Sequence, residues 1–334
     1  MLNSNNGLPD SFGRLAKKLR ISVTDRCNMR CVYCMPYNNT EWLNQKNILS
    51  FDQIVRLTRI FALRGIEKIK ITGGEPLVRN NLRLLIKSLA SIDKIRAISM
   101  TTNGVLLKDQ VKGLKEAGLD NVNISLDTFD RDRFKLMSGI DGLDKVIDSI
   151  NTAINQNLQV KINTVIMKGW NDDEISQFVN FSMKTGCTIK FIEFMPLDGT
   201  GIWSENMVVS MDEMIEKIGN EFGKLTSLDN DKADPARLYR LNEGNATLGF
   251  IPSITKPFCQ DCDRIRITAD GKLYTCLFEK KNYNLKQILD EGKSDIEISE
   301  YISKCIAEKP EGIIKIIKTR SLESGLNSMH TIGG

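Results

Sequence analysis

Histidine is nearly missing from this sequence: the 334 residues include a single one, His330. This scarcity argues against His-rich zinc catalysis, a 2-His-1-carboxylate iron site and a Ser-His-Asp triad in the body of the fold. Long hydrophobic runs are missing too, since no stretch approaches the roughly 18 apolar residues of a membrane helix. Residues 1–15 lack the apolar segment of a signal peptide. We therefore expect a cytoplasmic protein with no membrane contact.

A large excess of one charge sign is also lacking. Lys and Arg total 46 and Asp and Glu total 42, so the net charge is +4. This value is too small to indicate nucleic acid or a membrane surface as a partner, although a local basic pocket for an anion stays open. The composition, 41% hydrophobic and 26% charged, is that of a globular protein. The length suits about two domains.

Short β-branched runs alternate with amphipathic segments over the first two thirds of the chain. A helix-like segment at 50–65 begins with the capping-box pair Ser50 and Gln53. Six strand–helix units in a row predict parallel strands with right-handed crossovers. An open doubly wound sheet and a barrel that lacks its last two units both fit this pattern. The expected strands cover residues 20–24, 68–72, 97–102, 121–126, 160–166 and 189–195.

The unusual residues follow the ends of the predicted strands, where ligands bind in both arrangements. Cys27 follows the first strand, TGGEP (72–76) ends the second, TTNG (101–104) the third and SLD (125–127) the fourth. The pattern changes after Met195. We therefore predict a first domain at 1–200 and a C-terminal α+β region at 201–334.

Three of the eight cysteines, Cys27, Cys31 and Cys34, stand within eight residues at C-x3-C-x2-C spacing. In a reducing compartment such cysteines indicate a metal or redox centre rather than disulfides. Iron–sulfur cubanes usually take four thiolates, so three would leave one iron open to a small molecule. A zinc site that takes a fourth cysteine from the C-terminal region is not excluded by spacing alone.

A second trio, Cys259, Cys262 and Cys276, has C-x2-C-x13-C spacing and no histidine nearby, which points to a second centre with an open position. Arg264 and Arg266 lie between its last two cysteines, and strand alternation places both on one face. Two guanidiniums beside a metal site suit a phosphate or another anion, because Arg forks bind such oxygens in bidentate fashion.

The three-cysteine loop, with Tyr33 before its last cysteine and GGEP (73–76) one unit later, resembles the signature of the radical S-adenosylmethionine (SAM) superfamily. The fold of that superfamily implies an incomplete (βα)6 TIM-like barrel here, with a C-terminal α+β extension. The whole chain resembles the GTP 3′,8-cyclase family within it. The matching blocks are LRISVTDRCNMRCVYCMP, ITGGEPLVR, TTNG, NVNISLD, KINTVIMKGWND, FIEFM, FCQDCDRIRITADGKLYTCLF and the closing Gly333-Gly334.

This resemblance implies two [4Fe-4S] clusters, one on each cysteine trio, with SAM on the open iron of the first and GTP on that of the second. A radical derived from SAM would take a hydrogen atom from ribose C3′, and C3′ would then bond to C8 of guanine, as the first step of molybdenum cofactor biosynthesis. Tyr33, Gly74, Ser125 and Met195 match positions that contact SAM. Arg20, Lys70, Thr101, Lys161, Arg264, Ile265 and Arg266 match GTP positions, and Arg264, Arg266, Gly333 and Gly334 are expected to matter for turnover.

Lysines in the predicted strands fit this expectation. Lys68, Lys70, Lys161 and Lys190 lie in apolar runs, where a charge that faces a barrel interior is costly without a partner such as a triphosphate. Lys70 and Lys190 stand where the family commonly has Arg, so phosphate contacts there lose the guanidinium fork. Alternation places Lys190 on the opposite face from Glu193 and Met195. Either a bulge intervenes or these residues do not all line the site.

The remaining features give weaker predictions. Cys187 and Cys305 are expected to be small buried hydrophobes, and His330 to lie in a flexible tail. The family implies an electron donor, a downstream cyclic pyranopterin monophosphate synthase and a homodimer. One rival is a radical peptide maturase with an auxiliary cluster, although such enzymes usually carry longer C-terminal cysteine arrays. The other rival is a zinc-stabilised binding protein without catalytic activity.

Overall fold

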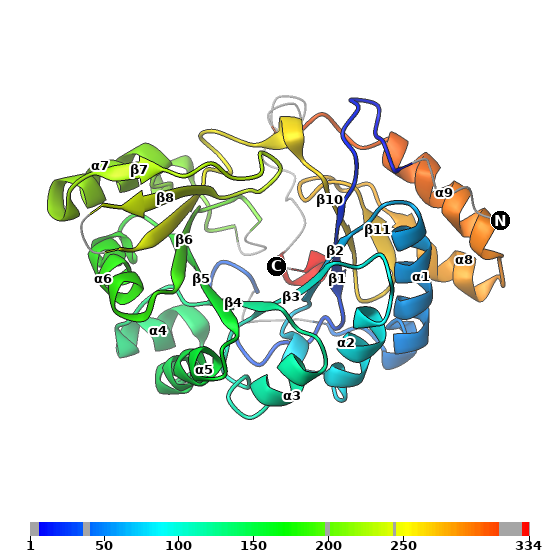
Figure 1. Cartoon of the computed structure of the whole chain (residues 1–334), viewed down its shortest axis with the longest axis horizontal. Coiled ribbons are helices and arrows are strands. Elements are labelled where there is room, and N and C mark those ends of the chain that lie inside the picture. Colours follow the sequence, from blue (N-terminus) through cyan, green and yellow to red (C-terminus); the bar gives the residue numbers. More distant parts are fainter. Residues whose placement is uncertain (1–6, 36–40, 198–200, 243–244, 314–328, 334) are drawn as a thin grey trace.

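The computed structural model describes residues 7–35, 41–197, 201–242, 245–313 and 329–333. Twelve strands within these residues form one sheet, in the order β12-β11-β10-β1-β2-β3-β4-β5-β6-β9-β8-β7. From β10 to β9 in this order, each strand pairs in parallel with the next one. The outer pairs, β10 with β11 and β9 with β8, are antiparallel. Figure 1 shows this sheet as a crescent with helices on its convex side.

The six predicted strands are all present, and their ends agree within two residues. They are β1 (Lys18–Ser22), β2 (Lys68–Thr72), β3 (Ala97–Thr102), β4 (Asn121–Ser125), β5 (Gln159–Ile166) and β6 (Thr188–Glu193). Alternation sorts their side chains into two faces. Leu19, Ile21 and Ile69 belong to the main hydrophobic core under the helices, while Arg20 and Lys70 point to the concave face.

The helices on the convex side follow the predicted amphipathic segments. Helix α1 begins at the predicted capping box, because Ser50 and Gln53 each accept a hydrogen bond from the backbone N–H of the other. Helix α4 was not predicted. The convex helices are α1 (Phe51–Leu63), α2 (Leu82–Ala90), α3 (Val111–Glu116), α4 (Arg131–Ser138), α5 (Leu143–Asn155), α6 (Ile175–Thr185) and α7 (Met211–Phe222).

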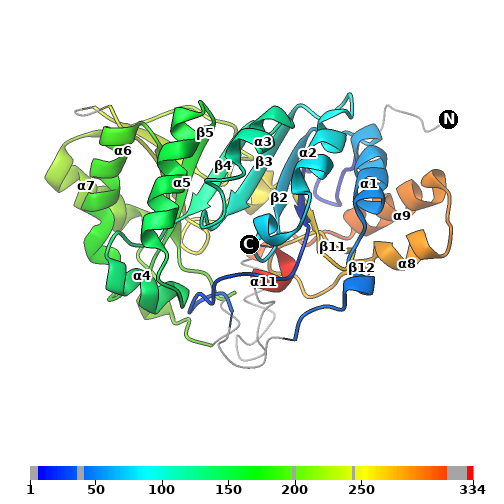
Figure 2. The ribbon, with the colours of Figure 1, turned by 90° about the horizontal axis from the view of Figure 1, so that it is seen from below.

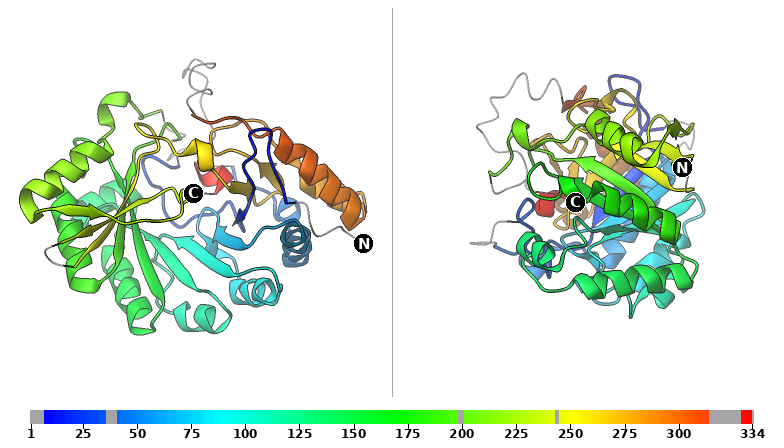
Figure 3. Two further views of the ribbon diagram at one scale, coloured as in Figure 1. Left: turned by 45° about the horizontal axis from the view of Figure 1, so that its top comes forward. Right: turned by 90° about the vertical axis from the view of Figure 1, so that its left-hand side faces the viewer.

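The C-terminal third extends both edges of the same sheet (Figure 3). Strand β9 (Thr247–Ile251) pairs in parallel with β6, and β10 (Arg264–Ile267) pairs in parallel with β1. The region 201–334 therefore has no separate sheet among its described residues, and the domain boundary near 200 stays a prediction. Its other elements are β7 (Leu225–Ser227), β8 (Arg237–Leu241), β11 (Lys272–Tyr274), β12 (Tyr283–Asn284), α8 (Leu285–Asp290), α9 (Asp295–Ala307) and α11 (Met329–Ile332).

Cys187 and Cys305 lie in the main hydrophobic core, at 4% and 2% exposure, as the sequence predicted. Among the described helices, none combines the length and apolar character needed to span a membrane.

Candidate functional site

The first cysteine loop follows β1 and is attached to the end of α4. The backbone N–H groups of Arg30 and Val32 donate to the carbonyls of Ser138 and Met137, at 2.8 and 2.9 Å. Cys27, Cys31 and Cys34 are all half-buried on this loop. The backbone bonds thus hold the three thiols at the C-terminal end of the parallel sheet.

The thiols of this loop form a donor set that fits an iron–sulfur cluster. Cys27 Sγ accepts hydrogen bonds from Met29 N at 3.4 Å and from Asn103 Nδ2 at 3.8 Å, the kind of contact that tunes cluster sulfurs. Burial raises the pKa of Cys27 to about 11. Burial and the charge of nearby Cys27 raise the pKa of Cys34 to about 12.

Among the described residues, no group of three or more His, Cys, Asp or Glu side chains is placed to hold a single metal ion.

The glycine pair of GGEP is packed against the first cysteine loop. A Cβ at Gly73 would lie 2.6 Å from the Thr24 carbonyl oxygen, and one at Gly74 would lie 2.4 Å from that of Arg26. Gly74 N also donates to Thr24 O at 2.8 Å. Both glycines are thus needed for the loop to approach the end of β2, and the SAM contact of Gly74 stays a prediction.

Glu75 joins the GGEP and TTNG segments. Its buried carboxylate accepts from Leu77 N, Thr102 Oγ1 and Asn103 N, at 3.0, 2.7 and 2.7 Å. Burial raises the pKa of Glu75 to about 7, against the opposing effect of these donors. Asn103 in turn contacts Cys27. The sequence placed both motifs at strand ends but gave Glu75 no role, because its partners are set by the fold.

Asp127 links the Cys31–Cys34 segment to the ends of β4 and β5. Tyr33 Oη donates to Asp127 Oδ2 at 2.5 Å, and Val165 N donates to Oδ1 at 2.8 Å. Burial raises the pKa of Asp127 to about 6. The Tyr33 ring also meets the ring of Phe194 edge-on, with centroids 6.3 Å apart. Tyr33, a predicted SAM contact, is therefore held from two sides.

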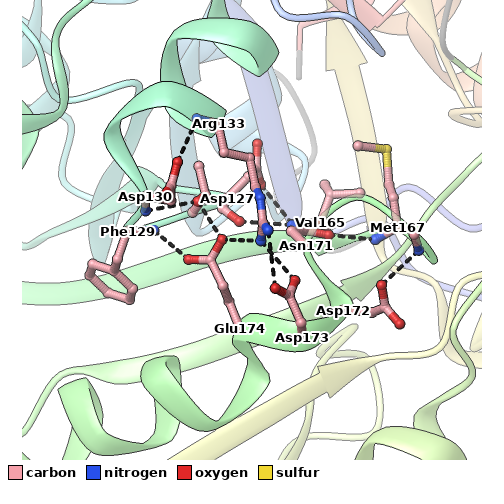
Figure 4. A network of polar contacts seen from close by, with 12 residues as sticks. Asp127, Phe129, Asp130, Arg133, Val165, Met167, Asn171, Asp172, Asp173 and Glu174 are labelled. Atoms are coloured by element: carbon pink, nitrogen blue, oxygen red, sulfur yellow. Dashed lines mark hydrogen bonds and ion pairs between the residues drawn. The ribbon is translucent and has the colours of Figure 1, made fainter.

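A second polar network braces this region (Figure 4). The buried Asn171 donates through Nδ2 to the carbonyls of Asp127 and Val165, at 2.7 and 2.8 Å. Glu174 accepts from Phe129 N at 2.7 Å and pairs with Arg133. The GWND block of the sequence (169–172) is thus explained by support of the loop after β4.

The second cysteine trio flanks β10 and β11. Cys259 and Cys262 precede β10, and Cys276 follows β11. Cys262 Sγ accepts from Arg264 at 3.4 Å and from Lys309 Nζ at 3.6 Å. Burial alone would raise the pKa of Cys262, but the two cations lower it to about 7. Burial raises the pKa of Cys276 to about 11. Thiol sulfurs beside cations are suited to be thiolate ligands.

Six cations form what we call the basic group on the concave face. Arg266, Arg20 and Lys70 are neighbours in register across β10, β1 and β2. Burial, then Arg20, Lys190 and Lys161, lower the pKa of Lys70 well below its usual value. Burial, then Arg20, lower the pKa of Arg266 to about 9. The basic group consists of Arg20, Lys70, Lys161, Lys190, Arg264 and Arg266.

Several atoms on this face have no partner. Within the described chain, the ammonium groups of Lys70, Lys161 and Lys190 make no hydrogen bond or ion pair. The negative charge of Asp234 raises the pKa of Lys70 and Lys190, against the effect of burial and of the other cations. Thr101 Oγ1, a predicted GTP contact, is buried without a partner. So is Asn163 Oδ1, on a residue that no sequence pattern singled out. Clustered cations and orphaned polar atoms fit an anionic ligand.

The register of strand β6 shows whether Lys190 and Glu193 lie on the same face of the sheet. Its register with β5 is continuous from Lys190 to Glu193, so no bulge intervenes. Lys190 belongs to the basic group on the concave face. Glu193 is fully buried on the other side and accepts from Met211 N and Ile254 N, at 3.0 and 2.8 Å. These residues therefore do not all line one site.

The other predicted contacts lie at different places in the fold. Ser125 ends β4 and pairs with Asn163, and Met195 packs near Cys259 and Cys276. The side chain of Ile265 is 2% exposed and belongs to the main core on the opposite face from Arg264 and Arg266. Only the backbone of Ile265 can therefore serve the predicted GTP contact.

The C-terminal segment enters the concave face, beside the first cysteine loop (Figure 2). Gly333 O accepts from Arg20 at 3.2 Å and from Arg266 at 3.0 Å. His330, predicted to lie in a flexible tail, belongs instead to α11, and its Nδ1 is 3.3 Å from the Cys34 carbonyl. Gly334 lies outside the described residues.

Comparison with known proteins accounts for this geometry. Residues 21–182 match the family model described as Radical SAM superfamily, and residues 187–314 match that of Molybdenum Cofactor Synthesis C. A GTP 3′,8-cyclase from Thermodesulfovibrio yellowstonii is 45% identical over 98% of this chain and all of its own length. The chain belongs to the GTP 3′,8-cyclase family. It is thus a radical SAM enzyme of molybdenum cofactor biosynthesis, and its family implies SAM and a [4Fe-4S] cluster.

Further relatives and solved structures agree with this assignment. The mitochondrial GTP 3′,8-cyclase of Arabidopsis thaliana is 38% identical over 93% of this chain and 81% of its own length. The crystal structure of Streptococcus suis SuiB bound to precursor peptide SuiA superposes with a TM-score of 0.66, covering 95% of this chain and 76% of that one. At 18% identity, the SuiB structure shows a shared fold alone.

Proposed function

We propose that this chain binds the triphosphate of GTP on the basic group and cyclises the nucleotide between two iron–sulfur clusters. The observation that carries this proposal is the set of six clustered cations on the concave face, near Cys262 and Cys276, in a chain 45% identical to a GTP 3′,8-cyclase. Like charges held together away from water repel one another, and a polyanion relieves that cost.

Each group of residues has a defined task in this proposal. Cys27, Cys31 and Cys34 would hold the first cluster, and Cys259, Cys262 and Cys276 the second. When bound, the first cluster and SAM supply the radical that removes a hydrogen atom from ribose C3′.

The remaining residues position the reactants. Asp127 fixes the Tyr33 ring within the first cysteine loop, where the superfamily binds SAM. The basic group orients the triphosphate, and the buried setting of Arg266, 8% exposed, keeps water from it. Gly333 touches the same two guanidiniums, Arg20 and Arg266, so the tail lies against the proposed nucleotide site.

The test is nucleotide-dependent release of 5′-deoxyadenosine. The protein is reconstituted anaerobically with iron and sulfide and given dithionite, SAM and one of GTP, ATP, CTP or UTP. We expect 5′-deoxyadenosine to form with GTP alone, with an equal loss of GTP. Release that is indifferent to the nucleotide would overturn the GTP assignment and favour the peptide-maturase alternative.

The electron donor, the homodimer, the downstream cyclic pyranopterin monophosphate synthase and the cytoplasmic location stay predictions. The domain division at residue 200 stays one as well.

A further inference from the structure

Lys309 is a buried ammonium group without a carboxylate partner. The residue is 4% exposed, and among the described ion pairs none includes it. Its three hydrogen bonds go to Cys262 O at 2.7 Å, Arg264 O at 3.0 Å and Cys262 Sγ at 3.6 Å. A lysine is almost never buried unless its charge is compensated. The sulfur of Cys262 is the acceptor in this set that can carry a negative charge.

The residues that follow Lys309 lie directly on the second cysteine trio. A Cβ at Gly312 would lie 2.8 Å from Cys259 Sγ, so only glycine lets the backbone pass this sulfur. Arg14 joins the two segments, because its guanidinium donates to the carbonyls of Cys259, Pro310 and Glu311, each at 2.7 Å. The Asp10 carboxylate forms an ion pair with Arg14, in which Arg14 Nε and Asp10 Oδ2 are 2.6 Å apart.

We propose that residues 309–312 form a clamp on the second cluster site, in which Lys309 is a positioning residue that compensates the thiolate charge of Cys262. The inference rests on the proposed second cluster and extends it to residues outside the cysteine motif. A cation within hydrogen-bonding distance of a ligating sulfur stabilises the reduced, more negative state of a cluster. The clamp therefore raises the reduction potential of the second cluster and slows loss of its iron.

The test isolates the second cluster in the full-length chain. Cys27, Cys31 and Cys34 are replaced by Ala, and the protein is reconstituted anaerobically with iron and sulfide. Lys309→Met removes the charge at nearly constant length, Lys309→Arg keeps it, and Lys304→Met is the matched control on the exposed side of α9. The readouts are the midpoint potential from an EPR-monitored redox titration and the rate of iron loss to a chelator.

We expect Lys309→Met to shift the midpoint potential to more negative values and to speed iron loss several-fold, while Lys309→Arg and Lys304→Met stay near the parent. Equal potential and equal iron loss in Lys309→Met and the parent would overturn the clamp but leave the second cluster intact. A parent protein that binds no cluster would overturn the proposed second cluster and the clamp together.

A second variant keeps the test informative if Lys309→Met does not fold, which its thermal melting curve would show. Gly312→Ala changes no charge but forces the backbone away from Cys259. The clamp predicts faster iron loss from this variant without the potential shift of Lys309→Met. Iron loss at the parent rate from Gly312→Ala would contradict the clamp.

Discussion

Glu75 illustrates at the scale of one residue how burial creates a pH dependence. Its pKa rises from 4.5 to about 7 in the fold, mainly through burial. The folded state binds this proton more tightly than the unfolded state. Protonated Glu75 therefore contributes fully to the free energy of unfolding below pH 4.5, and this contribution is lost as the pH rises to about 7. We expect Glu75→Gln to remove up to about 3 kcal/mol of this pH-dependent change in the free energy of unfolding.

Urea unfolding of the cluster-free protein between about pH 4.5 and about pH 7.5 measures this slope. Glu116→Gln is the matched control, because Glu116 is exposed on α3. The slope should persist in the control and flatten in Glu75→Gln. Parallel curves for the parent and Glu75→Gln would show that the carboxyl of Glu75 titrates alike in both states.

Short spacing in the sequence marks some individual residues as candidate ligands, and their roles stay predictions. Two cysteine trios and the pair Arg264 and Arg266 are visible as patterns, because ligands of one centre recur at short intervals. Glu75 and Lys309 do not stand out in the sequence, because each contacts partners supplied by other segments of the chain. Such roles depend on three-dimensional burial, which periodicity does not encode.

At the scale of the element, the turn after β2 decides where the first cysteine loop lies. Gly74→Ala would place a Cβ 2.4 Å from the carbonyl oxygen of Arg26. The loop must then move away, and the three thiols move with it. We expect Gly74→Ala to lose most of the first-cluster iron while the second cluster is retained. Iron analysis with EPR of each cluster separates the two.

Gly219→Ala is the control for this prediction. Gly219 lies within α7 and a Cβ there would meet nothing within 4 Å. We expect this variant to bind both clusters like the parent and to gain about 0.5–1 kcal/mol of stability from helix propensity. Full first-cluster occupancy in Gly74→Ala would show that the loop tolerates the extra methyl group.

Helices and strands could be predicted where a hydrophobic period within one short stretch of sequence marks them. The six alternating strands and α1 with its capping box came from such patterns. The positions of β9 and β10 could not be predicted in this way. These two strands follow each other in the sequence but lie at opposite edges of the six-strand unit. Strand pairing between distant segments is set by register and edge availability, and the sequence shows neither.

At the scale of the molecule, the C-terminal third completes the sheet. β9 covers the edge of β6 and β10 covers the edge of β1. A fragment of residues 1–200 would expose both edges and the apolar side chains beneath them, which promotes aggregation. We expect this fragment to be insoluble or unfolded by circular dichroism, while the full chain unfolds in one transition by both far-UV circular dichroism and tryptophan fluorescence. A folded, soluble fragment would instead support two independent domains.

The basic group predicts how the whole molecule responds to salt. Neighbouring cations of this group lower the pKa values of Lys70 and Arg266, so a triphosphate placed among them interacts with several charges at once. We expect the affinity for GTP, measured by calorimetry without SAM, to fall as ionic strength rises, because added ions screen these attractions.

Variants at Lys70 sharpen this expectation. Lys70→Gln should weaken GTP binding by about tenfold, the worth of one charged hydrogen bond, and should reduce the salt dependence. Lys70→Arg restores the fork that the family commonly has there and should bind GTP at least as tightly as the parent. Lys87→Gln, on the exposed face of α2, controls for net charge. Equal losses in Lys70→Gln and Lys87→Gln would mean that overall charge, rather than the concave face, attracts the nucleotide.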